Sequence, residues 1–150
     1  MSLGRTFYKV PLAEIMDENP PLVPRDAPLS EVGERVSSSG HVWVVEGRGS
    51  KKVVGVISEK DVLDIMAPIP NKSHTVGTIK IKSLHHAELT KAEDIMSKPV
   101  LSCEPQATVE EALGVLCGHR IRRLAVVHQG EIVGQVCLRA LIRGYSRYVT

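Results

Sequence analysis

The sequence predicts a mixed α/β fold of the α+β type, in which two pseudo-symmetric copies of one β-α-β-β-α unit pack through their sheets. Three observations lead to this prediction. Segments of residues 12–66 recur in the same order in residues 92–146. Each copy has an apolar pattern of helical period, followed by two runs rich in β-branched residues. Apolar residues make up 43% of the 150-residue chain and aromatic residues only 3%, so the core must be built from aliphatic side chains.

The internal repeat is the strongest of these signals, because self-similarity at a constant spacing is typical of a duplicated structural unit. Ala13–Met16 returns as Glu93–Met96, a spacing of 80 residues. Three further segments return close to this spacing: Ala27–Val32 as Ala107–Ala112, Val42–Val45 as Leu124–Val127, and Val53–Ile57 as Ile132–Val136. The predicted divisions are an N-terminal segment 1–11, a first repeat 12–66, a linker 67–91, a second repeat 92–146 and a C-terminal tail 147–150.

In the first repeat, an extended stretch at Leu22-Val23 precedes a helix. The apolar stripe of this helix is Leu29, Val32 and Val36, and Pro28 suits its first turn. Two strands are predicted at residues 42–45 and 53–57, with a turn between them at residues 46–52. A closing helix follows at residues 58–66.

The second repeat shows the same order of elements. Thr108 and Glu111 have the spacing of a capping box, in which each side chain satisfies a backbone N–H at the start of a helix. The stripe of this helix is Val109, Ala112, Leu113 and Leu116. An extended stretch is predicted at residues 100–101. Two strands are predicted at residues 124–127 and 132–136, with a turn between them at residues 128–130, and a closing helix follows at residues 138–145. The linker contains one further predicted strand, Thr78–Ile81.

Composition and charge exclude several classes of protein. The net charge of +2 is too small to indicate nucleic acid by itself, and no apolar run approaches the ~20 residues of a membrane span. Three cysteines without a CxxC pair predict reduced thiols in the cytoplasm rather than a disulfide framework. No metal site is predicted, because the linker histidines lack ligand spacing. The residues concerned are Cys103, Cys117, Cys137, His74, His85 and His86.

The ordered motifs Ile-Met, Ala-x-h-x-[EV], h-x-V-V and G-h-[IV]-[ST]-x-x-D-h, where h is an apolar residue, are present twice. This set resembles a tandem cystathionine β-synthase (CBS) domain pair, although the second copy of the last motif is degenerate. The resemblance implies a regulatory module without catalytic residues that binds AMP, ADP or ATP, with S-adenosylmethionine as a further candidate ligand. It also implies a homodimer that acts on a regulated protein of unknown identity.

The first repeat contains the last motif intact, as Gly55-Val56-Ile57-Ser58-Glu59-Lys60-Asp61-Val62. The resemblance implies that Asp61 binds the ribose hydroxyls and that Ser58 lies near phosphate at the helix N-terminus. A carboxylate can accept from two vicinal hydroxyls, and a helix N-terminus favours anions. The alternative is that Ser58 and Asp61 form only a helix cap.

An adenine ring is expected against apolar side chains and backbone of the first repeat. The residues expected there are Leu22, Val23, Pro24, Gly40, His41 and Val42. The alternative for Leu22, Val23 and Val42 is that their side chains belong to the core.

The second repeat departs from the motif, since Cys137 replaces the hydroxyl and Ala140 replaces the aspartate. One competent site in each chain is therefore expected. The resemblance implies that Arg122, Arg139 and Arg123 act on the phosphates of the nucleotide in the first repeat, because guanidinium groups suit phosphate oxygens. The alternative is that these arginines form only a solvated charged face.

Two other functions are compatible with the sequence. The chain could be a dimerisation or protein-docking scaffold with vestigial pockets, which the altered motif of the second repeat favours. Less favoured is binding of nucleic acid through the basic surface at Arg120–Arg123 and Arg139–Arg147, because aromatic stacking residues are scarce.

Overall fold

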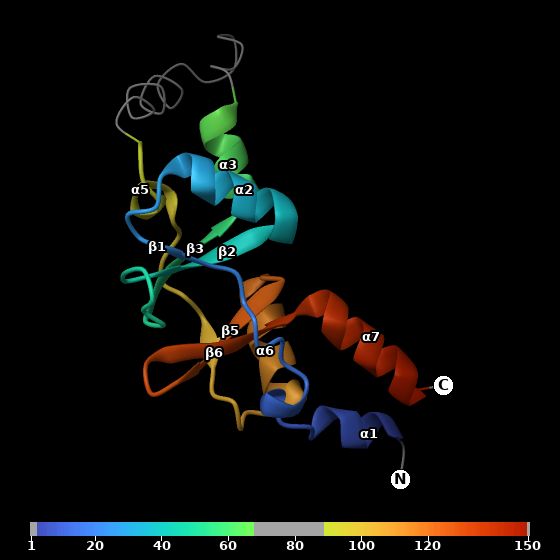
Figure 1. Ribbon diagram of the computed structural model, residues 1–150. Coiled ribbons are helices and arrows are strands. Elements are labelled where there is room, and N and C mark those ends of the chain that lie inside the picture. The colour runs from blue at the N-terminus through green and yellow to red at the C-terminus, as the bar shows by residue number, and fades with distance from the viewer. Residues whose placement is uncertain (1–2, 68–88, 150) are drawn as a thin grey trace. The chain divides into compact units, whose positions relative to one another are not determined.

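The computed structural model describes residues 3–67 and 89–149 (Figure 1). The chain forms two compact units. One consists of residues 21–99 and is called the first-sheet unit; the other consists of residues 1–20 and 100–150 and is called the second-sheet unit. The predicted strand at Thr78–Ile81 and the linker histidines lie outside the described residues.

The first-sheet unit contains a three-stranded sheet in the order β1-β2-β3. Strand β1 is parallel to β2, and β2 is antiparallel to β3. Its described elements are β1 (Leu22–Pro24), α2 (Leu29–Ser39), β2 (His41–Val45), β3 (Val53–Ser58), α3 (Glu59–Met66) and α5 (Ala92–Ile95). The predicted order of strands and helices is confirmed in this unit.

Helix α2 forms because its apolar residues recur at helical spacing and pack on the sheet. Val32 and Val36 are buried, as the predicted stripe requires, while Leu29 is half-buried. The helix ends at Gly40, which has φ 82° and donates its N–H to the carbonyl of Val36 at 2.7 Å. A glycine suits this left-handed position because it has no Cβ. The core around α2 consists of Val23, Ala27, Val32, Val36, Val42, Val44, Ile57 and Ala92.

The second-sheet unit repeats this architecture with strand order β4-β5-β6. Its elements are α1 (Leu3–Tyr8), the 3₁₀ turn η1 (Leu12–Glu14), β4 (Ser102–Cys103), α6 (Val109–His119), β5 (Arg123–His128), β6 (Glu131–Cys137) and α7 (Leu138–Val149). The extended stretch predicted at Val100–Leu101 leads directly into strand β4 (Ser102–Cys103). The strand begins at Ser102, where it pairs in parallel with Ala125 of β5.

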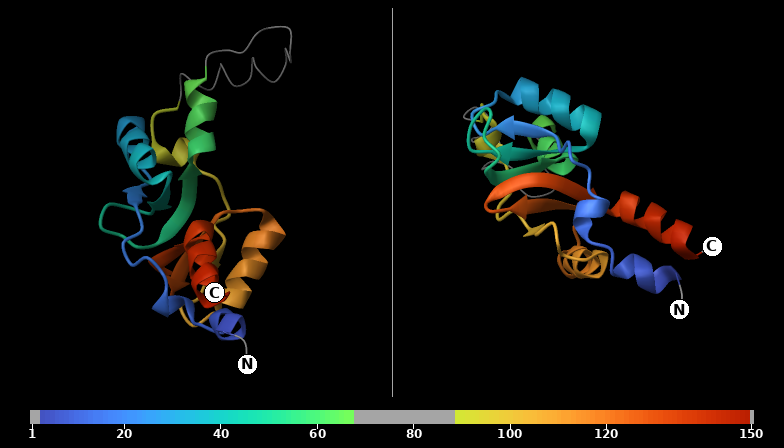
Figure 2. Two further views of the ribbon diagram at one scale, coloured as in Figure 1. Left: turned by 90° about the vertical axis from the view of Figure 1, so that its right-hand side faces the viewer. Right: turned by 60° about the horizontal axis from the view of Figure 1, so that its bottom comes forward.

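Helix α7 extends beyond its predicted end at Tyr145 and reaches Val149. Helix α1 lies alongside it, as Figure 2 shows, and the ring centroids of Phe7 and Tyr145 are 6.4 Å apart. An ideal Cβ at Gly144 would lie 2.7 Å from the ring of Phe7, so the absence of a side chain there lets the helices approach. This contact with a distant segment stabilises a longer helix than its local sequence predicts.

The two units exchange the first helical turn of each repeat. In the second-sheet unit, Leu12 donates its N–H to Ala107 at 2.8 Å. In the first-sheet unit, Ala92 donates its N–H to Ala27 at 2.9 Å. The side chains of Leu12 and Ala92 are fully buried in the cores of these units. Each compact unit therefore contains the helical turn of one repeat and the sheet of the other.

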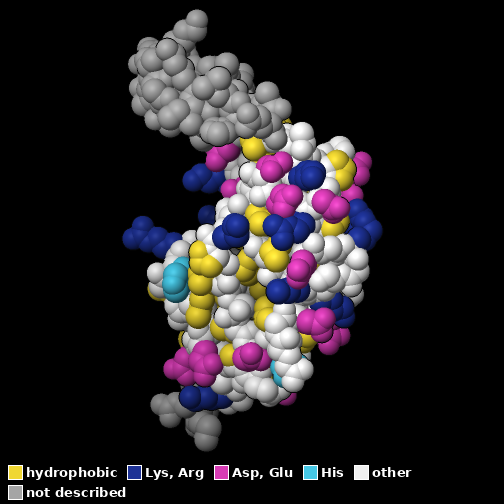
Figure 3. Space-filling view, turned by 90° about the vertical axis from the view of Figure 1, so that its left-hand side faces the viewer, with side chains coloured by type: hydrophobic (Ala, Val, Ile, Leu, Met, Phe, Trp, Pro, Cys, Tyr) yellow, Lys and Arg dark blue, Asp and Glu magenta, His cyan; other side chains and the backbone are white. Residues whose placement is uncertain are grey.

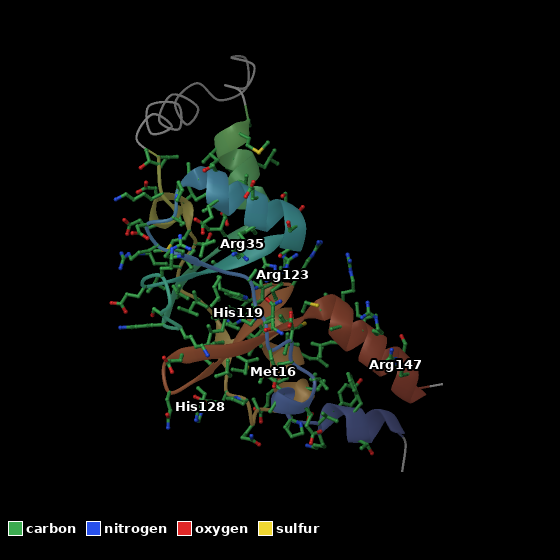
Figure 4. The ribbon with its side chains drawn as sticks, in the orientation of Figure 1. Met16, Arg35, His119, Arg123, His128 and Arg147 are labelled. Atoms are coloured by element: carbon green, nitrogen blue, oxygen red, sulfur yellow. The ribbon has the colours of Figure 1, made fainter. Side chains whose placement is uncertain are left out.

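The exchange explains why Ile-Met and glycine occur together in both repeats. Met16 lies against Gly134 of β6 (Met16 is labelled in Figure 4), and Met96 lies against Gly55 of β3. An ideal Cβ at Gly134 would lie 2.6 Å from the Met16 sulfur and 2.9 Å from the carbonyl oxygen of Asp17. Glycine leaves the space that the methionine of the docked turn fills.

Candidate functional site

The structure brings four of the predicted residues of the first repeat to one end of its sheet. His41, the first residue of β2, pairs with Ser58, the last residue of β3. Gly40 precedes β2, and Asp61 lies in the first turn of α3. The predicted strand-to-helix turn is therefore present.

The Asp61 carboxylate accepts three hydrogen bonds. Its Oδ2 accepts from the Ser58 backbone N–H at 2.9 Å and from the Ser58 hydroxyl at 3.2 Å, and Oδ1 accepts from the Ser97 hydroxyl at 3.2 Å. A carboxylate has about four acceptor positions. Ser58 and Asp61 thus form the helix cap of the alternative interpretation. Ribose binding by the same carboxylate stays a prediction.

Ser97 was missed by reasoning from the sequence. It follows the Ile-Met motif of the second repeat and forms an antiparallel bridge with Val56 of β3. Its backbone N–H donates to Val56 at 2.8 Å, and the N–H of Val56 donates back at 3.1 Å. The helical turn of the second repeat therefore supplies a hydroxyl to the carboxylate of the first, a contact that the motif spacing does not reveal.

The residues predicted to contact adenine divide into two groups. Val23 and Val42 are fully buried members of the core around α2, as the alternative interpretation expects, and Pro24 is also buried. Leu22 and Gly40 are partly exposed. Only a ligand that contacts the backbone could therefore use the two core valines.

His41 is also buried in the described structure, with 4% of its surface exposed. Its ring meets that of Trp43 edge-on, with centroids 5.6 Å apart. The backbone N–H of Trp43 donates to Pro21 at 2.9 Å, which holds the start of β1 beside β2. The residues predicted to contact adenine are thus neighbours in the first sheet and the turns beside it. Their contact with adenine stays a prediction.

The predicted phosphate residues converge at the corresponding end of the second sheet. Arg123 pairs with Cys137, and Leu138 at the start of α7 donates its N–H to Arg122 at 2.8 Å. Arg139 is the next residue of α7. Arg122 and Arg139 are exposed, whereas Arg123, labelled in Figure 4, is half-buried.

Within residues 3–67 and 89–149, none of these three arginines forms an ion pair with a carboxylate. The ion pairs of this part of the chain involve other residues, such as Arg25 with Glu93 at 2.7 Å and Arg48 with Glu31 at 3.0 Å. Three uncompensated guanidinium groups at one sheet end are suited to a polyanion.

A carboxylate also lies beside the second sheet, although Ala140 stands where the first repeat has Asp61. Asp17 forms a bridge with Gln135 of β6, and its Oδ2 accepts from the Gln135 side-chain amide at 3.1 Å. Its Oδ1 accepts from the backbone N–H of Asn19 at 2.9 Å. Local sequence patterns do not reveal this carboxylate, because the exchanged turn brings it to Gln135 from 118 residues away in the chain.

The resolved pKa shifts lie away from these two sheet ends. Hydrogen bonds from the backbone N–H groups of Thr90 and Lys91, at 3.0 and 2.9 Å, lower the pKa of Asp94 at the start of α5. Burial, together with the negative charge of Glu111, raises the pKa of the Cys103 thiol. Both shifts therefore reflect local structure.

The described residues contain no group of three or more His, Cys, Asp or Glu side chains that could hold a metal ion. In the same part of the chain, no helix has the length and apolar character needed to cross a membrane.

Comparison with known proteins identifies the family. The family model for the CBS domain matches the chain twice, at residues 12–68 and 92–147. The chain therefore belongs to the CBS domain family. The resemblance of the motifs and the predicted fold class are confirmed.

Two curated relatives are themselves uncharacterised. The chain is 26% identical over 134 residues to a 33.4 kDa protein from a ribosomal RNA operon of Thermofilum pendens, a match that covers 89% of the chain and 39% of that protein. It is 28% identical over 109 residues to a protein of Methanocaldococcus jannaschii, covering 61% and 65%. The chain thus spans less than two thirds of either relative.

Solved structures show the same fold. The CBS domain of a CBS-domain-containing membrane protein from Sphaerobacter thermophilus is 25% identical, with a TM-score of 0.70, covering 94% of this chain and 91% of that one. CBSX2 in complex with AMP is 18% identical, with a TM-score of 0.73 and coverage of 91% and 96%. A CBS domain pair in complex with 5′-methylthioadenosine and S-adenosyl-L-methionine is 17% identical, with a TM-score of 0.67 and coverage of 92% and 97%.

Proposed function

We propose that this CBS domain pair is a non-catalytic regulatory module that binds AMP, ADP or ATP through the turn between β3 and α3. The observation that carries the proposal is the position of Ser58 and Asp61 at this turn, with a carboxylate that already accepts hydroxyl hydrogen bonds. Two CBS domain pairs of the same fold are solved with AMP and with S-adenosyl-L-methionine and 5′-methylthioadenosine. These ligands share the adenosine moiety that the proposal requires.

The proposal assigns the ribose diol to Asp61 and the phosphates to Ser58, Arg122, Arg139 and Arg123. A ribose diol would take the acceptor positions that the Ser58 and Ser97 hydroxyls now use, so the carboxylate needs little rearrangement. The arginines are assigned because they lack carboxylate partners within the described ranges and would gain charge-assisted hydrogen bonds from phosphate.

The last part of the proposal is that the module associates with a second copy of itself and with a protein that it regulates. The module would act as a homodimer and pass the ligand signal to a regulated protein.

The test is titration calorimetry with AMP, ADP, ATP and S-adenosylmethionine on the protein and on Asp61→Ala. We expect about one ligand per chain. Loss of the charge-assisted bonds should weaken binding by about 1–3 kcal/mol, which is about 5- to 150-fold in Kd.

Asp61 also caps α3, so the control must remove a cap without touching the proposed site. Asp94→Ala does this, because Asp94 accepts backbone N–H groups at the start of α5 in the same way. Asp94→Ala should leave the ligand affinity unchanged. Equal losses in the two variants would assign the effect of Asp61 to folding and remove it from the ribose site.

An absence of heat with every ligand, in protein free of bound nucleotide, would favour the docking scaffold over the sensor. Nucleic-acid binding has less support, because aromatic residues make up only 3% of the chain and stacking platforms are therefore scarce. Figure 3 shows one face of the molecule, on which basic and acidic side chains are interspersed.

A further inference from the structure

One hydroxyl group of the first-sheet unit already occupies the carboxylate that the proposed function assigns to ribose. The Ser97 hydroxyl donates to Oδ1 of Asp61 at 3.2 Å. The two residues are 36 positions apart in the chain, and Ser97 follows the docked helical turn of the second repeat. The contact is therefore made by tertiary packing and is separate from the local cap of α3.

The Asp61 carboxylate has few acceptor positions left for a ligand. A carboxylate offers about four, two on each oxygen. On Oδ2, the backbone N–H and the hydroxyl of Ser58 take two positions, at 2.9 and 3.2 Å. On Oδ1, the Ser97 hydroxyl takes one. A vicinal diol presents two hydroxyls, so at least one of the present donors must leave before both ligand hydroxyls can bind to this carboxylate.

Ser97 is the donor that can leave at the lowest cost. It is exposed, whereas Ser58 is half-buried and is the N-cap residue of α3. A released Ser97 hydroxyl can donate to water instead, so no polar group is left without a partner. Its backbone stays in place, because the N–H groups of Ser97 and Val56 each donate to the carbonyl of the other, at 2.8 and 3.1 Å. Release therefore needs only the rotation of one side chain.

The second-sheet unit has the same arrangement with different chemistry. Asp17 follows the Ile-Met motif of the first repeat and forms an antiparallel bridge with Gln135 of β6. This bridge is the counterpart of the one between Ser97 and Val56. In both units, the residue after the Ile-Met motif thus contacts a second polar side chain of its unit. Asp17 has no hydroxyl and Ala140 has no carboxylate, so a contact of the Ser97 type is confined to the first-sheet unit.

We propose that Ser97 sets the affinity and the hydroxyl specificity of the nucleotide site by competing with ribose for Asp61. In the free protein, the Ser97 hydroxyl occupies an acceptor position that a ligand hydroxyl needs, and a ligand with a vicinal diol displaces it. A ligand without these hydroxyls leaves the contact intact and gains nothing from its removal. The inference rests on the proposed function and deepens it, because it adds a residue of the second repeat to the site of the first.

The first test is titration calorimetry with AMP and with dideoxy-AMP, which lacks both ribose hydroxyls. Removing the competitor in Ser97→Ala should tighten AMP binding about 3- to 10-fold and leave the affinity for dideoxy-AMP unchanged. Ser97→Thr keeps the hydroxyl and should restore the AMP affinity of the unchanged protein. Ser37→Ala is the matched control, because the Ser37 hydroxyl donates within α2 to the carbonyl of Glu34 at 2.8 Å. It should change neither affinity.

The second test is thermal unfolding of the same proteins without AMP and with saturating AMP. Because the contact exists only in the free protein, Ser97→Ala should lower the Tm of the free protein. With saturating AMP, the tighter binding offsets this loss, so the Tm values of Ser97→Ala and of the unchanged protein should nearly coincide.

Equal or weaker AMP binding by Ser97→Ala, or an equal gain for both ligands, overturns this inference. The proposed function survives that result if Asp61→Ala still weakens AMP binding. If Asp61→Ala leaves the AMP affinity unchanged, the ribose lies elsewhere and both proposals are wrong. An absence of AMP binding by both the unchanged protein and Ser97→Ala also overturns both.

Discussion

At the scale of single residues, Gly55 and Gly134 show how the repeat motif depends on close contact. Both lie under a methionine of an exchanged helical turn. However, the atoms that an added Cβ would meet at the two glycines differ in how easily they can move. The three atoms nearest to a Cβ at Gly55 all belong to the side chain of Met96, whereas the three nearest to a Cβ at Gly134 include the backbone carbonyl oxygen of Asp17.

This difference predicts the effect of adding one methyl group. Gly134→Ala should destabilise the protein by about 1–3 kcal/mol, because the backbone of the docked turn must move, and Gly55→Ala should cost less. Gly114→Ala is the control, since a Cβ there meets nothing within 4 Å on a helix. It should be neutral or stabilising. Urea unfolding of the three variants measures the order, and a larger loss for Gly55→Ala would contradict it.

At the scale of elements, the short helix α5 depends on the carboxylate of Asp94. The backbone hydrogen bonds that lower the pKa of Asp94 stabilise its ionised form in the folded protein. For a carboxyl group with a lowered pKa, this stabilisation is present above the unfolded pKa of about 3.9 and is lost as the pH falls through the folded value.

We therefore expect Asp94→Asn to lower stability near neutral pH, by less than about 1 kcal/mol because the carboxylate is exposed and solvent screens it. The difference from the unchanged protein should disappear as the pH falls through the lowered pKa of Asp94 in the folded protein. Thermal unfolding as a function of pH measures this. Asp26→Asn provides the control, because Asp26 is an exposed carboxylate that accepts no backbone N–H in the described structure. A difference that persists in acid would contradict the prediction.

At the scale of the whole molecule, the exchanged helical turns couple the two repeats. Leu12 belongs to the first repeat by sequence and to the core of the second-sheet unit by packing. A substitution in the exchanged turn of one repeat should therefore destabilise the sheet of the other repeat first.

Leu12→Ala tests this coupling. Removing a fully buried leucine should destabilise the protein by about 2–5 kcal/mol. Hydrogen exchange should show the loss of protection in β4, β5 and β6 before β1, β2 and β3. Val32→Ala, in the core around α2, is the matched substitution and should give the opposite order. Equal loss in both sheets for each variant would show that the molecule opens as a single unit.

The sequence by itself determined the duplicated α+β fold, the helix with its apolar stripe at Leu29, Val32 and Val36, and the capping turn at Ser58 and Asp61. These features depend on residues within a few positions of one another, where periodicity and local hydrogen bonding act. Only the tertiary structure decided which helical turn docks on which sheet, and with it the contacts of Ser97 with Asp61 and of Asp17 with Gln135. Those contacts join residues that are far apart in the chain, and they arise from packing that a local pattern does not encode.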